Sequence, residues 1–153
     1  MKTLRFLRAI LLAVFLPALL SCAPDNSEDF TYRCVTLPPL PAGARYQESH
    51  YRDALVYDLR VFGCSAEKEV KCDGGRCDIL TDKYAIEVDR ARKWHEAIGQ
   101  AVHYSIALNR KPCIAIYDFD KLSPENMHFL IKVCSDLKIK VVFIIGFADV
   151  NRE

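Results

Sequence analysis

The chain has no excess of charge of either sign and no long basic run. Its 153 residues contain 21 Lys and Arg against 20 Asp and Glu, a net charge of +1. Three of the basic residues, Lys2, Arg5 and Arg8, lie at the very start, so the remainder carries 18 basic and 20 acidic residues, about −2. This balance excludes a protein that coats nucleic acid non-specifically through charge alone. Local basic clusters remain at 90–93 and 110–111.

The signatures of several common chemistries are also missing. The sequence has no glycine-rich phosphate-binding loop, no dinucleotide-binding glycine fingerprint and no Ser, His and Asp in the order of a hydrolase triad. No internal repeat is visible. With 51% hydrophobic residues, a chain of this length can bury one real core, but it is too short for two domains.

The first residues have the layout of a secretory signal peptide: a basic start, an apolar run from Ala9 to Leu20, and then Ser21 and Cys22. The apolar run is short for a membrane span. The ending Leu19-Leu20-Ser21-Cys22 resembles a bacterial lipobox, which implies cleavage before a lipidated Cys22. We therefore expect export and a lipid anchor in the cell envelope, facing the periplasm or the exterior. The alternatives are an uncleaved anchor and cleavage that leaves Cys22 unmodified.

An exported protein meets an oxidising compartment, where an even number of cysteines suggests disulfides. Beyond Cys22 there are six, which allow many different pairings. Cys72 and Cys77 flank the turn sequence Asp73-Gly74-Gly75-Arg76, so we predict a disulfide between them across a hairpin. The alternative, a zinc site, lacks a second closely spaced Cys or His pair.

The hydrophobic spacing divides the chain into a leader (1–21), a proline-rich extended tether (22–43) and one α/β domain (44–153). Within the domain we expect a mixed central sheet, a three-strand meander plus two further strands, flanked by helices. The predicted helices are 44–59, 91–108 and 124–137, and the predicted strands are 67–72, 76–81, 84–89, 113–117 and 141–145.

A two-residue turn joins the second and third strands of the meander. If Thr81 faces Tyr84 across this turn, Asp78 lies directly opposite Glu87. Because side chains alternate between the two faces of a strand, Asp89 projects from the same side as Glu87. The register therefore predicts three carboxylates on one face of the hairpin.

On the other face, the same register places Ile79 against Ile86, a pair suited to a core. Like charges that face each other across a hairpin destabilise it, so the carboxylates need a counter-charge. Carboxylate oxygens are ligands for hard divalent cations. The pattern thus favours a metal site, and Glu87, between two apolar residues in a half-buried strand, is costly as an unpaired structural acid.

This order of elements, with an Asp on the second strand of the meander and a Glu on the third, resembles the core of the restriction-endonuclease-like phosphodiesterases, the PD-(D/E)xK superfamily. It also looks like a small, uncharacterised bacterial lipoprotein branch of that superfamily. The resemblance extends from about Tyr46 to Phe143. The residues that carry it are Asp78, Glu87-Val88-Asp89, Lys93-Trp94, Gly99-Gln100 and Tyr104.

The resemblance implies a nuclease that uses Mg²⁺ or Mn²⁺, with Asp78 and Glu87 as catalytic metal ligands and Asp89 as a third ligand. Lys93 would position the attacking water or the phosphate. The superfamily usually places a lysine two residues after the acidic residue, where this chain has Asp89. Lys93 comes one helical turn later and can reach back. Alternatives are Asp89 as the N-cap of the following helix and Lys93 as a solvated surface residue.

Further contacts are implied on the flanking helices. Gln100 and Tyr104 share a helix flank with Lys93 and would contact the nucleic-acid strand; the alternative is a helix edge hydrogen-bonded to the sheet. Glu48 and His50, on the first helix, are expected to approach the cleft.

These features together predict an exported, lipid-anchored, metal-dependent nuclease that hydrolyses phosphodiester bonds in nucleic acid. The alternative is a catalytically inactive nuclease-fold module with a binding or structural role in the cell envelope. The acidic balance, the anchor and the missing strand lysine favour that alternative.

Overall fold

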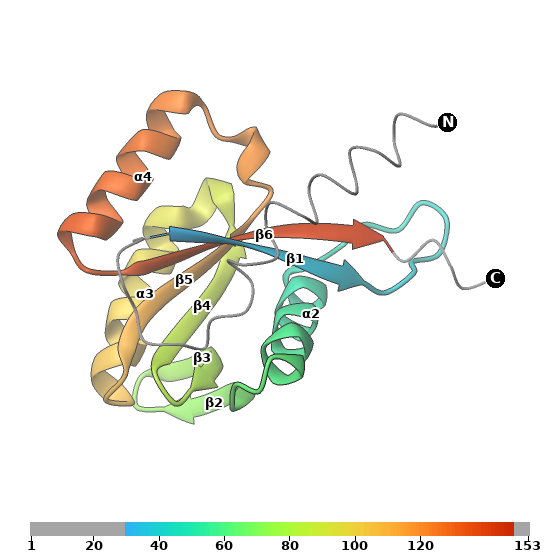
Figure 1. The fold of residues 1–153 in the computed structure, drawn as a ribbon. Coiled ribbons are helices and arrows are strands. Elements are labelled where there is room, and N and C mark those ends of the chain that lie inside the picture. Colours follow the sequence, from blue (N-terminus) through green and yellow to red (C-terminus); the bar gives the residue numbers. More distant parts are fainter. Residues whose placement is uncertain (1–29, 149–153) are drawn as a thin grey trace.

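The computed structural model of the chain describes residues 30–148 (Figure 1). The predicted leader and the predicted lipidation site at Cys22 lie outside this range. Two short 3₁₀ turns lie at Ala91–Lys93 and Phe119–Lys121. The other elements are, in order, β1 (Phe30–Leu37), α2 (Glu48–Val61), β2 (Ala66–Cys72), β3 (Gly75–Thr81), β4 (Tyr84–Arg90), α3 (Trp94–Ala107), β5 (Lys111–Tyr117), α4 (Pro124–Asp136) and β6 (Lys140–Ala148).

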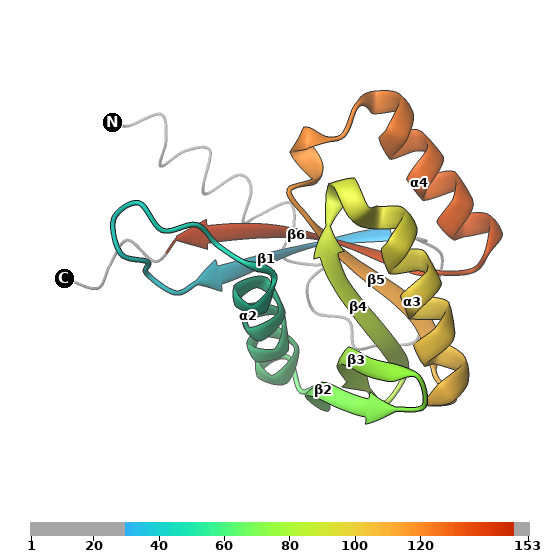
Figure 2. The same cartoon turned by 180° about the vertical axis from the view of Figure 1, so that it is seen from behind.

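The strands form one six-stranded mixed sheet in the order β1-β6-β5-β4-β3-β2. The strands β2, β3 and β4 make the predicted antiparallel meander, and β4, β5, β6 and β1 run parallel to one another. Helix α2 covers one face of the sheet, and α3 and α4 cover the other (Figures 1 and 2). The predicted α/β class with a mixed sheet is therefore confirmed.

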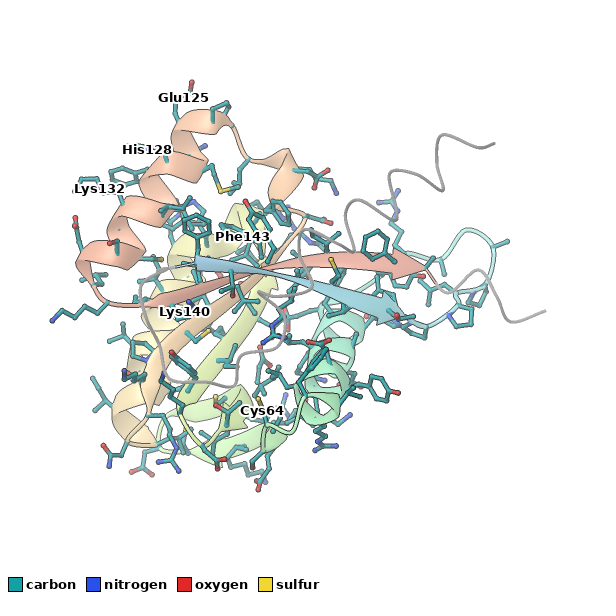
Figure 3. The ribbon with its side chains drawn as sticks, viewed as in Figure 1. Cys64, Glu125, His128, Lys132, Lys140 and Phe143 are labelled. Atoms are coloured by element: carbon teal, nitrogen blue, oxygen red, sulfur yellow. The ribbon has the colours of Figure 1, made fainter. Side chains whose placement is uncertain are left out.

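A separate apolar core lies on each face of the sheet. The core beneath α2 is built around Leu55, Leu59, Ile79, Ile86 and Val88. The core beneath α3 and α4 is built around Trp94, Ile114, Ile116, Leu130 and Phe143. Figure 3 shows the opposite, outer side of α4, where Glu125, His128 and Lys132 point away from the sheet. No helix within residues 30–148 is long and apolar enough to cross a membrane.

The tether prediction is wrong for residues 30–37, which form strand β1 and add a sixth strand to the sheet. This strand pairs in parallel with β6 over its whole length, from Phe30 opposite Val141 to Leu37 opposite Ala148. Val35 and Leu37 are buried beneath α2. The sequence did not indicate this strand because its partner strand lies more than a hundred residues away and because prolines follow it directly.

The hairpin between β3 and β4 has the predicted register. Ile79 pairs with Ile86 and Leu80 with Ala85. The hydroxyl of Thr81 accepts a hydrogen bond from the backbone N–H of Tyr84 at 2.8 Å, which closes the two-residue turn. Extended by one position beyond the paired residues, this register sets Asp78 opposite Glu87.

The predicted disulfide between Cys72 and Cys77 is wrong. In the β2–β3 register Cys72 pairs with Gly75, and Cys77 pairs with Val70, so the two cysteines are not cross-strand neighbours. Both are free thiols, and the Cys77 thiol donates to the carbonyl of Ile79 at 3.3 Å. The turn is tighter than expected because Gly74 adopts a positive φ of 78°, which glycine permits without strain.

Replacing Cys72 with alanine is accordingly expected to change the free energy of unfolding by less than about 1 kcal/mol, the usual range for a half-buried position without a special interaction. Loss of a true disulfide would cost roughly 2–5 kcal/mol. Urea unfolding of the wild type and the variant under non-reducing conditions measures the difference. A loss in the disulfide range would show that the register above is wrong.

Candidate functional site

Acidic side chains lie close together near the C-terminal ends of the parallel strands. Strand β4 ends just after Asp89, and α2 begins at Glu48 after the chain leaves β1 at the same edge (Figure 2). Open α/β sheets bind ligands in the crevice outside the carboxyl ends of their strands. The position alone therefore marks this edge as a candidate site.

Four carboxylates are close enough for their charges to act on one another: Glu48, Asp78, Glu87 and Asp89. The backbone N–H of Val88 donates to Oδ2 of Asp78 at 2.9 Å, which ties β3 to β4 next to Glu87. The structure thus brings the three predicted carboxylates of the hairpin together, and it adds the predicted Glu48 from α2.

Glu87 lies at the centre of the group and is the least compensated. The residue is only 7% exposed, and Oε2 has no hydrogen-bond partner within residues 30–148. Burial, followed by the charges of Asp78, Glu48 and Asp89, raises the pKa of Glu87 to about 9. Because burial in a low-dielectric interior disfavours a charge, this carboxyl group is protonated at neutral pH unless a cation joins it.

Asp78 is buried and is held by an arginine that the sequence analysis missed. Arg52 on α2 places Nη1 3.5 Å from Oδ1 of Asp78 and 3.0 Å from Oε1 of Glu69 on β2. Glu69 has a positive φ of 57° and interrupts the β2–β3 pairing opposite Asp78. Burial raises the pKa of Asp78, and the Val88 N–H and Arg52 oppose that rise.

Arg52 was recognisable in principle. It lies four residues after Glu48, so both side chains share one face of α2. Once Glu48 is placed near the cleft, a basic residue one turn further along the same face is the natural counter-charge for the carboxylates.

Asp89 is buried, and Oδ1 accepts a hydrogen bond from the backbone N–H of Arg90 at 2.7 Å. It does not cap a helix, since the N-cap of the 3₁₀ turn is Arg90 and the N-cap of α3 is Lys93. The N-cap alternative is therefore wrong. Burial raises the pKa of Asp89, and the charge of Lys93 acts against that rise.

Lys93 lies on the rim of the group. Its side chain is 47% exposed, and Nζ is 3.5 Å from Oε2 of Glu96. Its charge opposes the rise that burial causes in the pKa of Asp89 and of Glu48. His50, by contrast, caps α2: its Nδ1 accepts a hydrogen bond from the backbone N–H of Gln47 at 3.0 Å.

The two residues expected to contact nucleic acid differ in exposure. Gln100 is exposed on α3. Tyr104 is 7% exposed, and its hydroxyl lies 2.8 Å from the position that a Cβ would take at Gly75. It hydrogen-bonds the backbone of Arg76. Tyr104 thus matches the structural alternative, a helix edge bonded to the sheet, and leaves little surface for a strand.

The carboxylates do not surround a common point as the side chains stand. Within residues 30–148, no group of three or more His, Cys, Asp or Glu is arranged to hold a metal ion. A site for Mg²⁺ needs fewer protein ligands, because this ion usually takes one or two carboxylates and completes its octahedron with water and substrate phosphate. Asp78 and Glu87, on adjacent strands, are the two carboxylates on which such a site would depend.

Comparison with known proteins found two similar viral proteins. The putative KilA-N domain-containing protein L33 of Acanthamoeba polyphaga mimivirus is 35% identical over 120 residues, 76% of this chain and 45% of L33. The putative KilA-N domain-containing protein R878 of the same virus is 38% identical over 53 residues, 34% of this chain and 15% of R878. The chain therefore spans less than half the length of these relatives. No family model and no solved structure matches it.

Proposed function

We propose that this protein is a divalent-metal-dependent phosphodiesterase that acts on nucleic acid and is built on a restriction-endonuclease-like core. The observation that carries the proposal is the buried carboxylate of Glu87, which lacks a partner for Oε2 and faces Asp78. Keeping this buried acid protonated at neutral pH costs folding stability, which a purely structural role would not favour. A cation that binds there removes the cost.

The arrangement of the elements supports the fold part of the proposal. The order α2-β2-β3-β4-α3-β5, with an antiparallel meander followed by a parallel strand, is the order expected from the resemblance. Asp78 lies on the middle strand of the meander and Glu87 on its last strand. Strand β1 is an addition outside that core.

The donor chemistry fits Mg²⁺ or Mn²⁺. Carboxylate oxygens are the hard ligands that these ions prefer, and Asp78 and Glu87 supply them from two adjacent strands. When bound, the ion would supply a water of lowered pKa and stabilise negative charge on the phosphate.

The remaining side chains have distinct tasks in this proposal. Arg52 and the Val88 N–H orient Asp78 through its two oxygens. Asp89 extends the acidic group towards Lys93. Lys93, exposed on the rim, can hold the attacking water or offset charge on a substrate phosphate.

Incubation of the purified protein with single- and double-stranded DNA and RNA, with Mg²⁺, Mn²⁺ or EDTA, tests the activity. Metal-dependent cleavage is expected, and Glu87→Ala is expected to reduce it by more than about a hundredfold, because even supporting residues of a metal site are worth 10–100-fold. Glu125→Ala, on the outer side of α4 (Figure 3), is the matched control and should cleave normally. Absence of metal-dependent cleavage, or equal cleavage by Glu87→Ala, would refute the nuclease.

The second candidate is a nuclease-fold module that binds nucleic acid without cleaving it. Asp89, at the position where the superfamily usually has a lysine, favours it. In either case nucleic acid as the partner fits the similarity to the two KilA-N domain-containing proteins. Calorimetry with Mn²⁺ distinguishes a site that binds metal without activity from a site that binds none. Export and attachment to the membrane through a lipid on Cys22 remain part of both candidates.

A further inference from the structure

A second cluster lies at the same edge of the sheet, on the opposite face of β4 from Asp89. Arg90 ends the strand and pairs in register with Tyr117 of β5. Its guanidinium carbon lies 5.6 Å from the centre of the Tyr117 ring, within the range of a cation–π contact. Because side chains alternate along a strand, Arg90 is directed to the α2 side and Asp89 to the α3 side.

Three tyrosines lead from this arginine to the surface. Tyr117 stacks on Tyr51 of α2 with a centroid separation of 4.1 Å and an angle of 12°. Tyr51 meets Tyr46 edge-on at 6.2 Å. The Tyr46 hydroxyl donates to the carbonyl of Pro38 at 3.0 Å, which anchors the ring beside the β1–α2 loop. Tyr117 is buried, whereas Tyr51 and Tyr46 are only partly covered.

The Arg90 guanidinium hydrogen-bonds Tyr117, and one of its donors, Nε, is not used by the described part of the chain. The side chain of Arg90 is 37% exposed, while Nε is enclosed and has no hydrogen-bond acceptor within residues 30–148. Oδ2 of Asp118 is 3.9 Å away, beyond hydrogen-bond distance, and that same oxygen lies 2.9 Å from Nζ of Lys121. The enclosed Nε is out of reach of a ligand, so a ligand would meet the exposed part of the guanidinium, whose donors suit an anionic acceptor such as a phosphate.

This arginine–tyrosine cluster is continuous with the acidic group. The pKa of Tyr117 is raised mainly by burial and further by the charges of Glu48 and Asp89. Tyr51 and Glu48 lie one turn apart on α2. Asp89 and Arg90 are consecutive at the end of β4, so a chain molecule with one phosphate at the carboxylates would bring its neighbouring nucleotide towards Arg90.

We propose that Arg90, with the exposed parts of Tyr46 and Tyr51, binds one unpaired nucleotide of a single-stranded nucleic acid next to the carboxylates. This inference rests on the proposed function, since it names the substrate of the same site. Guanidinium donors suit phosphate and base acceptors, and tyrosine rings suit the faces and edges of a base. A base is free for such contacts only when it is unpaired, and the balanced charge of the chain supplies no broad basic surface for a duplex.

Fluorescence anisotropy tests the subsite through binding alone. The probes are a short labelled single strand and its duplex form, with Ca²⁺ in place of Mg²⁺. Arg90→Gln is expected to weaken single-strand binding roughly tenfold or more, because the substitution removes a charge-assisted hydrogen bond. Tyr46→Leu is expected to weaken it several-fold, to about tenfold. The matched control is Arg92→Gln, which removes an exposed charge two residues away and should change binding by less than about twofold.

Equal losses in Arg90→Gln and Arg92→Gln would show that only bulk charge matters and would overturn the subsite. So would a duplex that binds as tightly as the single strand, or no binding of either. Arg90→Lys is a further control that keeps the charge. Circular-dichroism melting curves of Arg90→Lys and Arg90→Gln separate misfolding from the loss of contacts. If cleavage is absent but binding still depends on Arg90, the nuclease proposal fails and the subsite stands. If cleavage is present but Arg90→Gln and Arg92→Gln bind alike, the subsite fails and the nuclease proposal stands.

Discussion

Glu87→Gln is expected to raise the melting temperature of the metal-free protein while it abolishes metal-dependent cleavage. The pKa of Glu87 is about 9 in the folded chain against an ordinary value of 4.5. Between these values the folded protein holds a proton that the unfolded chain releases, so stability falls as pH rises through this window. Glutamine stays neutral and avoids that loss.

The gain should therefore depend on pH. Near pH 5 the substitution is expected to change little, whereas near pH 9 it should stabilise by a few kcal/mol, roughly 10 °C in melting temperature. Thermal melts of the wild type, Glu87→Gln and the control Glu125→Gln in EDTA measure this difference. Equal pH dependence in all three would mean that Glu87 is not the buried acid described here.

Metal should reverse the order of stability. A cation that replaces the proton on Glu87 stabilises only the folded wild type, so Mg²⁺ or Mn²⁺ is expected to raise its melting temperature most at high pH. Glu87→Gln should respond weakly at any pH. A simple structural acid would give a variant that is less stable, or equally stable, and insensitive to metal.

Removal of strand β1 is expected to prevent stable folding. A chain that begins at Ala44, the start of the domain as predicted from sequence, lacks Val35 and Leu37, each 2% exposed in the core beneath α2. Burial of each side chain contributes roughly 1.5–3 kcal/mol, and the pairing with β6 is lost as well. The total approaches the net stability of a typical domain, about 5–15 kcal/mol.

Single substitutions in the full chain test the same point without truncation. Leu37→Ala should cost roughly 2–5 kcal/mol in urea unfolding, because Leu37 packs so closely on Gly146 that a Cβ there would lie 2.5 Å from its Cδ1. The exposed neighbour Thr36→Ala should cost less than about 0.5 kcal/mol. If the Ala44 chain unfolds cooperatively with the stability of the longer one, β1 is dispensable and the tether prediction was sound.

Where the determining interactions are local, the sequence predicted the structure well. The turn at 82–83 closes on the Thr81 hydroxyl, and that closure sets the register which brings Asp78 beside Glu87. The two main helices of the α3–α4 layer follow from their apolar periodicity. Local rules failed at the β2–β3 turn, where one glycine shortened the loop and separated Cys72 from Cys77.

Other features were decided only by contacts between distant segments. Arg52 lies on α2, yet its guanidinium belongs to the acidic group through Asp78 on β3 and Glu69 on β2. The stacking of Tyr51 on Tyr117 joins residues 66 positions apart. The hydrophobic periodicity of either segment carries no information about these contacts, since each contact depends on how α2 packs on the complete sheet.

The sequence by itself determined the hairpin and the set of carboxylates on one of its faces, because alternation and a two-residue turn act over about ten residues. Only the tertiary structure decided that β1 completes the sheet and how deeply Glu87 is buried. Strand pairing over more than a hundred residues and the exclusion of water are properties of the assembled layers, and no local stretch of sequence encodes them.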